Sequence, residues 1–284
     1  MAERTTARKP ASSRPPSLRR ERALVAEGAR FVIGCDEVGR GAIAGPVALG
    51  LCVVDLERRV PRGLRDSKLL PEKRRVELQP LVSRWATHSS VGMASNVEID
   101  ELGLTAALGL AGARALAALI DDGLPCSEDV VVLLDGKFDY LTAGLAAYGI
   151  ADRPRVTTTI KADMTCASVS GASVLAKVAR DTLMIGHHDD YPPYNWVSNK
   201  GYGSSAHWAA IDEFGATDLH RHTWLRTPSL FDLEDAGEAT EEGPFDASDV
   251  DDAGFADAGD SGAEESDDDV LDLEDASLAE PAVR

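Results

Sequence analysis

The stretch Phe31-Val-Ile-Gly-Cys-Asp-Glu-Val-Gly-Arg-Gly41 joins a short apolar run, two adjacent carboxylates and a glycine-rich segment. Because the apolar run stops at charged residues, we expect a buried strand that has ended where Asp36 and Glu37 begin. A second apolar run covers residues 47–54, so the glycine-rich segment is expected to be a turn between two strands. The two carboxylates are therefore predicted to stand at one edge of a sheet.

The segments that follow have alternating helical and strand patterns. Helices are predicted from residue 71, over residues 102–120 and over residues 169–183, and strands over residues 85–95, 130–134 and 156–160. A hairpin-like group of strands followed by alternating helices and strands indicates an α/β fold, in which helices flank a mixed sheet.

Charge divides the chain into three parts. Of the formal net charge of −19, residues 231–284 carry −20, because they hold 21 acidic residues and one basic residue. We interpret residues 231–284 as an acidic disordered tail and residues 1–30, rich in Arg, Pro and Ser, as a basic flexible segment. Residues 31–230 hold 28 − 8 = 20 basic residues and are long enough for one catalytic domain.

The cysteines and apolar runs bear on the location of the protein. The four cysteines have no Cys-x-x-Cys spacing, which is typical of reduced thiols in a cytoplasmic protein. No apolar run approaches the roughly 20 residues that span a bilayer. We therefore predict a cytoplasmic protein that does not interact with membranes.

Two further carboxylates share the position of Asp36 and Glu37. Asp135 and Asp163 each follow an apolar strand, and carboxylates gathered at one sheet edge repel one another unless cations neutralise them. Oxygen ligands favour Mg²⁺ or Mn²⁺, and two such ions about 3.5–4 Å apart can promote phosphoryl displacement. Each position also has an ordinary explanation, as a turn, a helix cap or a solvated strand end. Only the four together favour a metal site.

Three other patterns have simpler explanations than a cofactor, metal or nucleophile site. The glycines after Glu37 loosely fit a dinucleotide-binding turn, but that turn must open a helix, whereas a strand-like run follows Pro46. The tract His187-His-Asp-Asp190 fits a solvated loop better than a metal site. Ser173 and Lys177 fit a polar helix face better than a Ser–Lys nucleophile.

Several motifs spread over residues 31–226 resemble the type 2 ribonucleases H, the bacterial ribonuclease HII family. They are Gly34-Cys-Asp-Glu-Val-Gly-Arg-Gly41, Asp66-Ser-Lys68, Leu133-Leu-Asp-Gly136, Lys161-Ala-Asp163, Gly171-Ala-Ser-Val-Leu-Ala-Lys-Val-Ala-Arg-Asp181, Tyr191-Pro-Pro-Tyr194, Asn199-Lys-Gly-Tyr202 and His207. Leu69 departs from the family pattern, which has a lysine there, and Gly171 replaces a usual alanine.

The resemblance implies a ribonuclease H-like fold with a helical C-terminal extension. Asp36, Glu37, Asp135 and Asp163 would be the catalytic, metal-binding residues for Mn²⁺ or Mg²⁺. The enzyme would hydrolyse the RNA strand of RNA–DNA hybrids. It would also nick 5′ of ribonucleotides embedded in duplex DNA, leaving a 3′-hydroxyl and a 5′-phosphate, and so serve ribonucleotide removal from DNA.

The resemblance also assigns the residues that bind substrate. Gly39, Arg40 and Gly41 would read the 2′-hydroxyl, which is what distinguishes RNA from DNA at one position. Tyr202 would stack on the sugar of the next deoxynucleotide. Phosphate contacts would come from Lys68, Lys177, Arg180 and Lys200.

Three questions stay open at this point. The alternative function is a non-catalytic module that binds RNA–DNA hybrids and uses the carboxylates structurally. The acidic tail could compete with substrate or could simply be solvated. We predict a monomer, while the preferred ion, the preferred substrate and the protein partners are not indicated by the sequence.

Overall fold

The computed structural model describes residues 14–150 and 153–225. The acidic tail and residues 1–13 lie outside this part, so the predictions for them are not addressed by the structure. The described residues contain a five-stranded sheet in the order β3-β2-β1-β4-β5.

The sheet is mixed. β1 (Phe31–Val38), β2 (Val47–Val54) and β3 (Ala86–Ala94) form an antiparallel group, while β4 (Val130–Asp135) and β5 (Arg155–Thr159) continue it in parallel from β1. The predicted α/β fold with a mixed sheet is confirmed.

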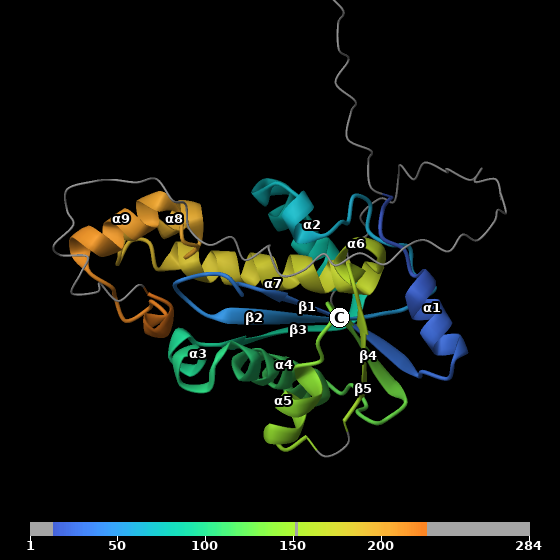
Figure 1. Cartoon of the computed structure of the whole chain (residues 1–284). Helices are drawn as coiled ribbons and strands as arrows, with labels where there is room; N and C mark the ends of the chain where they lie inside the picture. Colours follow the sequence, from blue (N-terminus) through green and yellow to red (C-terminus); the bar gives the residue numbers. More distant parts are fainter. Residues whose placement is uncertain (1–13, 151–152, 226–284) are drawn as a thin grey trace, which may run out of the picture. The chain divides into compact units, whose positions relative to one another are not determined.

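Helices cover both faces of the sheet (Figure 1). One face carries α7 (Ala167–Gly186), together with α1 (Arg19–Ala26), α2 (Glu72–Trp85) and the short α6 (Ala162–Thr165). The opposite face carries α4 (Leu104–Asp121), α3 (Asn96–Leu102) and α5 (Leu141–Ala147).

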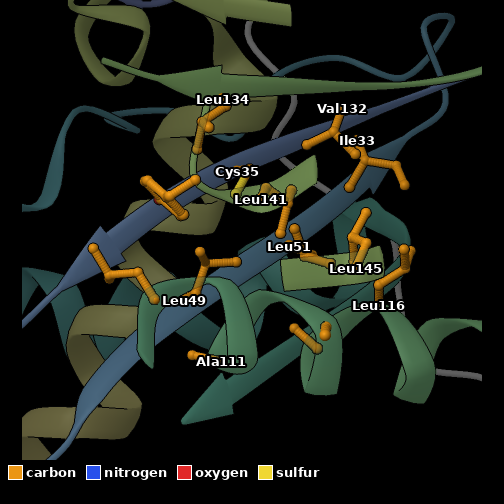
Figure 2. Close-up of a cluster of buried hydrophobic side chains, with 14 of the residues drawn as sticks. Ile33, Cys35, Leu49, Leu51, Ala111, Leu116, Val132, Leu134, Leu141 and Leu145 are labelled. Carbon is orange, nitrogen blue, oxygen red and sulfur yellow. The ribbon is translucent and has the colours of Figure 1, made fainter. Parts of the chain in front are cut away.

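The larger part of the core lies between the sheet and α4. Figure 2 shows β1 and β2 side chains such as Ile33 and Leu49 facing Ala111 and Leu116 of α4 and Leu145 of α5. Within the described residues, α4 is the one helix long and apolar enough to cross a membrane. Its packing against β2, β3 and α5 accounts for that apolar character as core.

α7 approaches the sheet closely because two strand positions facing it are glycine. A Cβ on Gly34 would lie 2.2 Å from the Ser168 carbonyl carbon, and one on Gly50 would lie 2.3 Å from the Ala172 carbonyl oxygen. This packing brings the polar residues of α7, including Ser173, against the end of β1.

The chain continues from α7 into a helical extension, as predicted. It contains α8 (Trp196–Asn199), α9 (Ser205–Phe214) and two short 3-10 turns at Pro192–Tyr194 and His222–Trp224, and a third 3-10 turn lies earlier at Ser67–Leu69. Trp196 and Tyr194 pack on Met184 of α7, which anchors the extension.

Three predicted boundaries differ from the structure. The helix predicted over residues 102–120 is two helices, because Gly103 has a φ of +79° and separates α3 from α4. Trp85 ends α2 rather than beginning β3. Asp36 and Glu37 lie within β1 and not after it, because β1 stays paired with β2 as far as Val38.

The interpretation of residues 1–30 as flexible is wrong for α1. Leu18 and Leu24 are buried, and the carboxylate of Glu21, also buried, accepts hydrogen bonds from the Ser168 N–H at 2.9 Å and hydroxyl at 2.8 Å. The basic residues dominate the composition of this segment and hide the apolar positions that dock it. α1 therefore supports the start of α7.

We expect Leu24→Ala to lower the free energy of unfolding by about 2–5 kcal/mol, the range for a buried leucine. The matched control is the neighbouring Val25→Ala, since Val25 is 39% exposed, with an expected loss of about 0.5 kcal/mol. Urea unfolding of both variants measures the difference. Equal losses would show that α1 does not contribute to the fold.

Candidate active site

Four carboxylates from three parts of the fold line one cleft. Asp36 and Glu37 come from β1, Asp135 is the last residue of β4, and Asp163 lies in α6, directly after β5. β1 and β4 are parallel neighbours, with Cys35 paired to Leu134, so the residues that follow this pair reach the same edge of the sheet.

Asp36 and Glu37 point to opposite faces of the sheet because they are consecutive in a strand. Glu37 turns toward the α5 side, where the Tyr140 hydroxyl donates to its Oε2 at 2.9 Å. Asp36 turns toward α7, where Ser173 lies beside its carboxylate. The edge of β1 thus presents a carboxylate on either side.

Burial and repulsion from neighbouring carboxylates disfavour the charged forms of Asp36 and Asp135. Burial raises the pKa of Asp36 well above its usual value, and the charges of Glu37, Asp135 and Asp163 raise it further. Burial and the charge of Asp163 raise the pKa of Asp135 to about 6. The buried Oδ1 of Asp163 has no hydrogen-bond partner. A cation in the cleft would relieve all three conditions.

Lys68 supplies part of that positive charge. Its Nζ lies 2.6 Å from Asp163 Oδ2 and 3.1 Å from Asp66 Oδ2. Burial lowers the pKa of Lys68, but the hydrogen bonds and charges of these two carboxylates outweigh it and raise the pKa above its usual value. No three acidic, histidine or cysteine side chains among the described residues are close enough, as they stand, to enclose one metal ion. The oxygen-only donor set and the unpartnered Asp163 Oδ1 nevertheless fit Mg²⁺ or Mn²⁺.

Six of the predicted substrate-binding residues lie in the cleft wall. They are Gly39, Arg40, Gly41, Lys68, Lys177 and Tyr202. The Arg40 side chain is 62% exposed and its Nη1 lies 3.6 Å from Glu37 Oε1. The Lys177 Nζ is held by Asp181 at 2.9 Å and lies 5.2 Å from the centre of the Tyr202 ring.

Arg180 and Lys200 are placed differently, and the predicted phosphate contact is wrong for Arg180. Its guanidinium is fully buried and donates to the carbonyl oxygens of Ala44, Pro46 and Lys200. Lys200 is also buried, and its ammonium contacts Glu72 and the Val197 carbonyl rather than the cleft. Motif positions alone did not show which basic side chains turn inward.

Several residues of the cleft were not singled out by the sequence analysis as site residues. Asp66 and Ser67 lie beside Lys68, and the Ser173 hydroxyl donates to the Ser67 Oγ at 2.8 Å. Asp66 and Ser67 belong to the motif Asp66-Ser-Lys68, so the sequence contains a pattern that could have identified them. Ser173 was read as part of a polar helix face, and nothing in the sequence pattern indicated Tyr140.

Two buried histidines of the extension hold the backbone of Tyr202. The Thr217 N–H donates to His220 Nδ1 at 2.9 Å, so His220 carries its proton on Nε2 and donates it to His207 Nε2 at 3.1 Å. His207 then carries its proton on Nδ1 and donates it to the Tyr202 carbonyl at 2.9 Å. The chain of hydrogen bonds requires both rings to be neutral.

Comparison with known proteins gives the family. The sequence pattern of the family described as ribonuclease HII matches residues 33–227. The chain is 47% identical to ribonuclease HII of Streptomyces griseus over 220 residues, covering 76% of this chain and 86% of that protein. It is 41% identical to ribonuclease HII of Cereibacter sphaeroides, with 74% and 91% coverage.

Solved structures agree with the fold. The ribonuclease H2 of Pyrococcus horikoshii superposes with a TM-score of 0.55 at 26% identity, covering 68% of this chain and 93% of that one. Ribonuclease HII of Archaeoglobus fulgidus, solved in complex with PCNA, has a TM-score of 0.56 at 24% identity, with 71% and 99% coverage, and supports the fold alone.

The fold and these relatives define the protein class as a ribonuclease H. Within that class, the chain belongs to the ribonuclease HII family.

We expect acid to destabilise the protein through the histidine pair. Burial, with the charge of His207 second, lowers the pKa of His220 to about 4, and burial lowers the pKa of His207. The unfolded chain, with a pKa near 6.5, therefore binds more protons than the folded one as pH falls. The stability is present above about pH 6.5 and is lost toward pH 4, by on the order of 2 kcal/mol for His220.

The measurement is the free energy of unfolding at pH 6.5 and pH 4.5. His220→Asn should reduce its pH dependence, whereas the exposed control His222→Asn should retain it. The same pH dependence in both variants would contradict the role given to His220.

Proposed function

We propose that the enzyme is an endonuclease that hydrolyses the RNA strand of RNA–DNA hybrids and nicks 5′ of a ribonucleotide embedded in duplex DNA. The products would be a 3′-hydroxyl and a 5′-phosphate, and the biological role would be ribonucleotide removal from DNA. The observation that carries this proposal is one cleft that holds four carboxylates beside Tyr202 and a Gly-Arg-Gly loop whose Arg40 and Gly41 are exposed.

The carboxylates of Asp36, Glu37, Asp135 and Asp163 would hold two divalent ions, Mn²⁺ or Mg²⁺. Bound there, such ions supply an activated water molecule and stabilise the leaving oxygen of the phosphodiester. The Tyr140 hydroxyl orients the carboxylate of Glu37, and the Ala162 N–H, which donates to Asp135 Oδ1 at 2.7 Å, orients that of Asp135. Lys68 is 67% exposed and can contact a substrate phosphate.

Gly41 supports nucleic-acid binding at this loop. Its φ is not in the positive range, and a Cβ there would meet no protein atom within 4 Å. Neither the backbone conformation nor packing within the protein therefore requires glycine at this exposed position. Close approach by a substrate backbone does explain it.

A monomeric, cytoplasmic enzyme is part of the proposal. All four cysteines are free thiols in the structure, which is compatible with a reducing compartment.

The first test is cleavage of a DNA duplex that contains one ribonucleotide, with Mn²⁺ or Mg²⁺. We expect a nick on the 5′ side of the ribonucleotide and none in the presence of a chelator. Asp36→Asn should reduce the rate by at least about 10³-fold, because it removes a charge that would hold the metal, while duplex binding is retained. If the unchanged protein binds the duplex but does not cleave it with either ion, the non-catalytic hybrid-binding module is favoured.

The second test concerns Gly41. Gly41→Ala should leave the melting temperature unchanged, because the Cβ enters open space, but should raise KM for the ribonucleotide-containing duplex about tenfold or more. Gly186→Ala is the matched control, since its Cβ also meets no atom within 4 Å and Gly186 lies at the far end of α7. If both variants cleave like the unchanged protein, substrate does not approach Gly41.

A further inference from the structure

Arg221 lies directly beneath the Gly39–Gly41 loop. The side chain is fully buried, and its planar guanidinium donates to three carbonyl oxygens of the loop region: Gly39 at 2.7 Å, Arg40 at 3.1 Å and Gly45 at 3.1 Å. Two of these carbonyls belong to the segment proposed to read the ribose. Arg221 lies far from that segment in the sequence and follows α9 in the extension.

These hydrogen bonds fix the orientation of two peptide groups. The described residues contain no cis peptide bond, so the carbonyl and the N–H of each peptide point in opposite directions. The carbonyls of Gly39 and Arg40 point toward Arg221. The N–H groups of Arg40 and Gly41, which complete the same two peptides, therefore point away from it, and both residues line the cleft.

Arg180 holds the loop from the α7 side. Gly39 has a φ of +87°, and a Cβ there would lie 2.1 Å from Arg180 Nε. Arg180 also donates to the carbonyls of Ala44 and Pro46, just beyond the loop. A shift of the loop away from Arg221 would break its hydrogen bonds, and a shift toward Arg180 would meet the Arg180 side chain.

Burying two positive charges side by side is costly. Burial, with the charge of Arg180 second, lowers the pKa of Arg221 to about 9. A lysine could not reach three carbonyls in one plane, and an apolar residue would leave these buried carbonyls unpaired. Such a cost is consistent with a requirement for one defined loop conformation.

We propose that Arg221 is a positioning residue for ribose recognition: it orients the peptides of Gly39 and Arg40 so that the N–H groups of Arg40 and Gly41 face the 2′-hydroxyl. This inference rests on the proposed function of the loop. Arg221 acts through the backbone and does not itself contact substrate.

The experiment measures how well the protein distinguishes a ribonucleotide from a deoxyribonucleotide. In an Asp36→Asn background, which is expected to bind without cutting, dissociation constants are measured for a duplex with one ribonucleotide and for the same duplex in all-DNA form. The ratio of the two constants is the discrimination. Arg221→Lys should lower this ratio about tenfold and change the affinity for the all-DNA duplex by less than about threefold.

Arg58→Lys is the matched control. Arg58 also donates to two backbone carbonyls, those of Arg84 and Trp85, but it lies outside the cleft lining. This variant should keep the discrimination of the Asp36→Asn parent. A ratio in Arg221→Lys equal to that of the parent would overturn the proposal, as would an equal loss of affinity for both duplexes.

Two further outcomes are distinguishable. If the parent itself does not prefer the ribonucleotide, the proposed function of the loop has failed, and the inference fails with it. If circular dichroism shows that Arg221→Lys does not fold, Trp224→Leu decides, since the Arg221 guanidinium lies 5.0 Å from the centre of the Trp224 ring. A smaller loss of discrimination in this variant supports the proposal, and no loss overturns it.

Discussion

Repulsion between buried carboxylates is the constraint around which the end of β1 is arranged. Asp36 and Asp163 are buried and Asp135 is half-buried; the charges of Asp135 and Asp163 raise the cost of ionising Asp36, and the charge of Asp163 raises that of ionising Asp135. The protein offsets part of this cost with the ammonium of Lys68 and with a hydrogen bond from the Ala162 backbone. The negative charge that remains, together with the buried and unpartnered Oδ1 of Asp163, favours binding of a cation. The fold therefore gathers negative charge that a bound metal ion would neutralise.

This arrangement depends on close packing elsewhere. α7 can bring Ser173 to Asp36 only because Gly34 and Gly50 let its backbone approach the sheet, and α1 holds the start of α7 through Glu21. A cavity or an added side chain at this contact would displace Ser173 from its place beside Asp36. Stability of the α7 face and geometry of the cleft are thus coupled through one helix.

The sequence was sufficient for the parts that follow from local pattern. Apolar runs located β1, β2 and β4, and the position of Asp36, Glu37 and Asp135 after such runs placed them at one sheet edge. Local pattern could not show that β1 pairs beyond Asp36, because that depends on the length of its partner β2. It also could not show which arginines are buried. In the sequence, Arg180 looks like any basic residue on a polar helix face. It points inward because it donates to the carbonyls of Pro46 and Ala44, which lie 134 and 136 residues earlier in the chain.

The cleft carboxylates and the buried guanidinium groups of Arg180 and Arg221 have separate roles, because the backbone of residues 36–41 lies between them. Carboxylates line the cleft on one side of this segment. Beneath its glycine loop, Arg221 donates to the carbonyls of Gly39 and Arg40, and Arg180 donates to the carbonyls of Ala44 and Pro46 just beyond it. The loop carbonyls are thereby withdrawn from the cleft, which leaves N–H donors toward a ligand that offers oxygen acceptors. A nucleic acid is such a ligand, through its phosphates and its 2′-hydroxyls. Under the proposed function, hydrolysis would depend on Asp36 and Glu37 and recognition on the backbone of Gly39–Gly41, so the two would use different residues of one short segment.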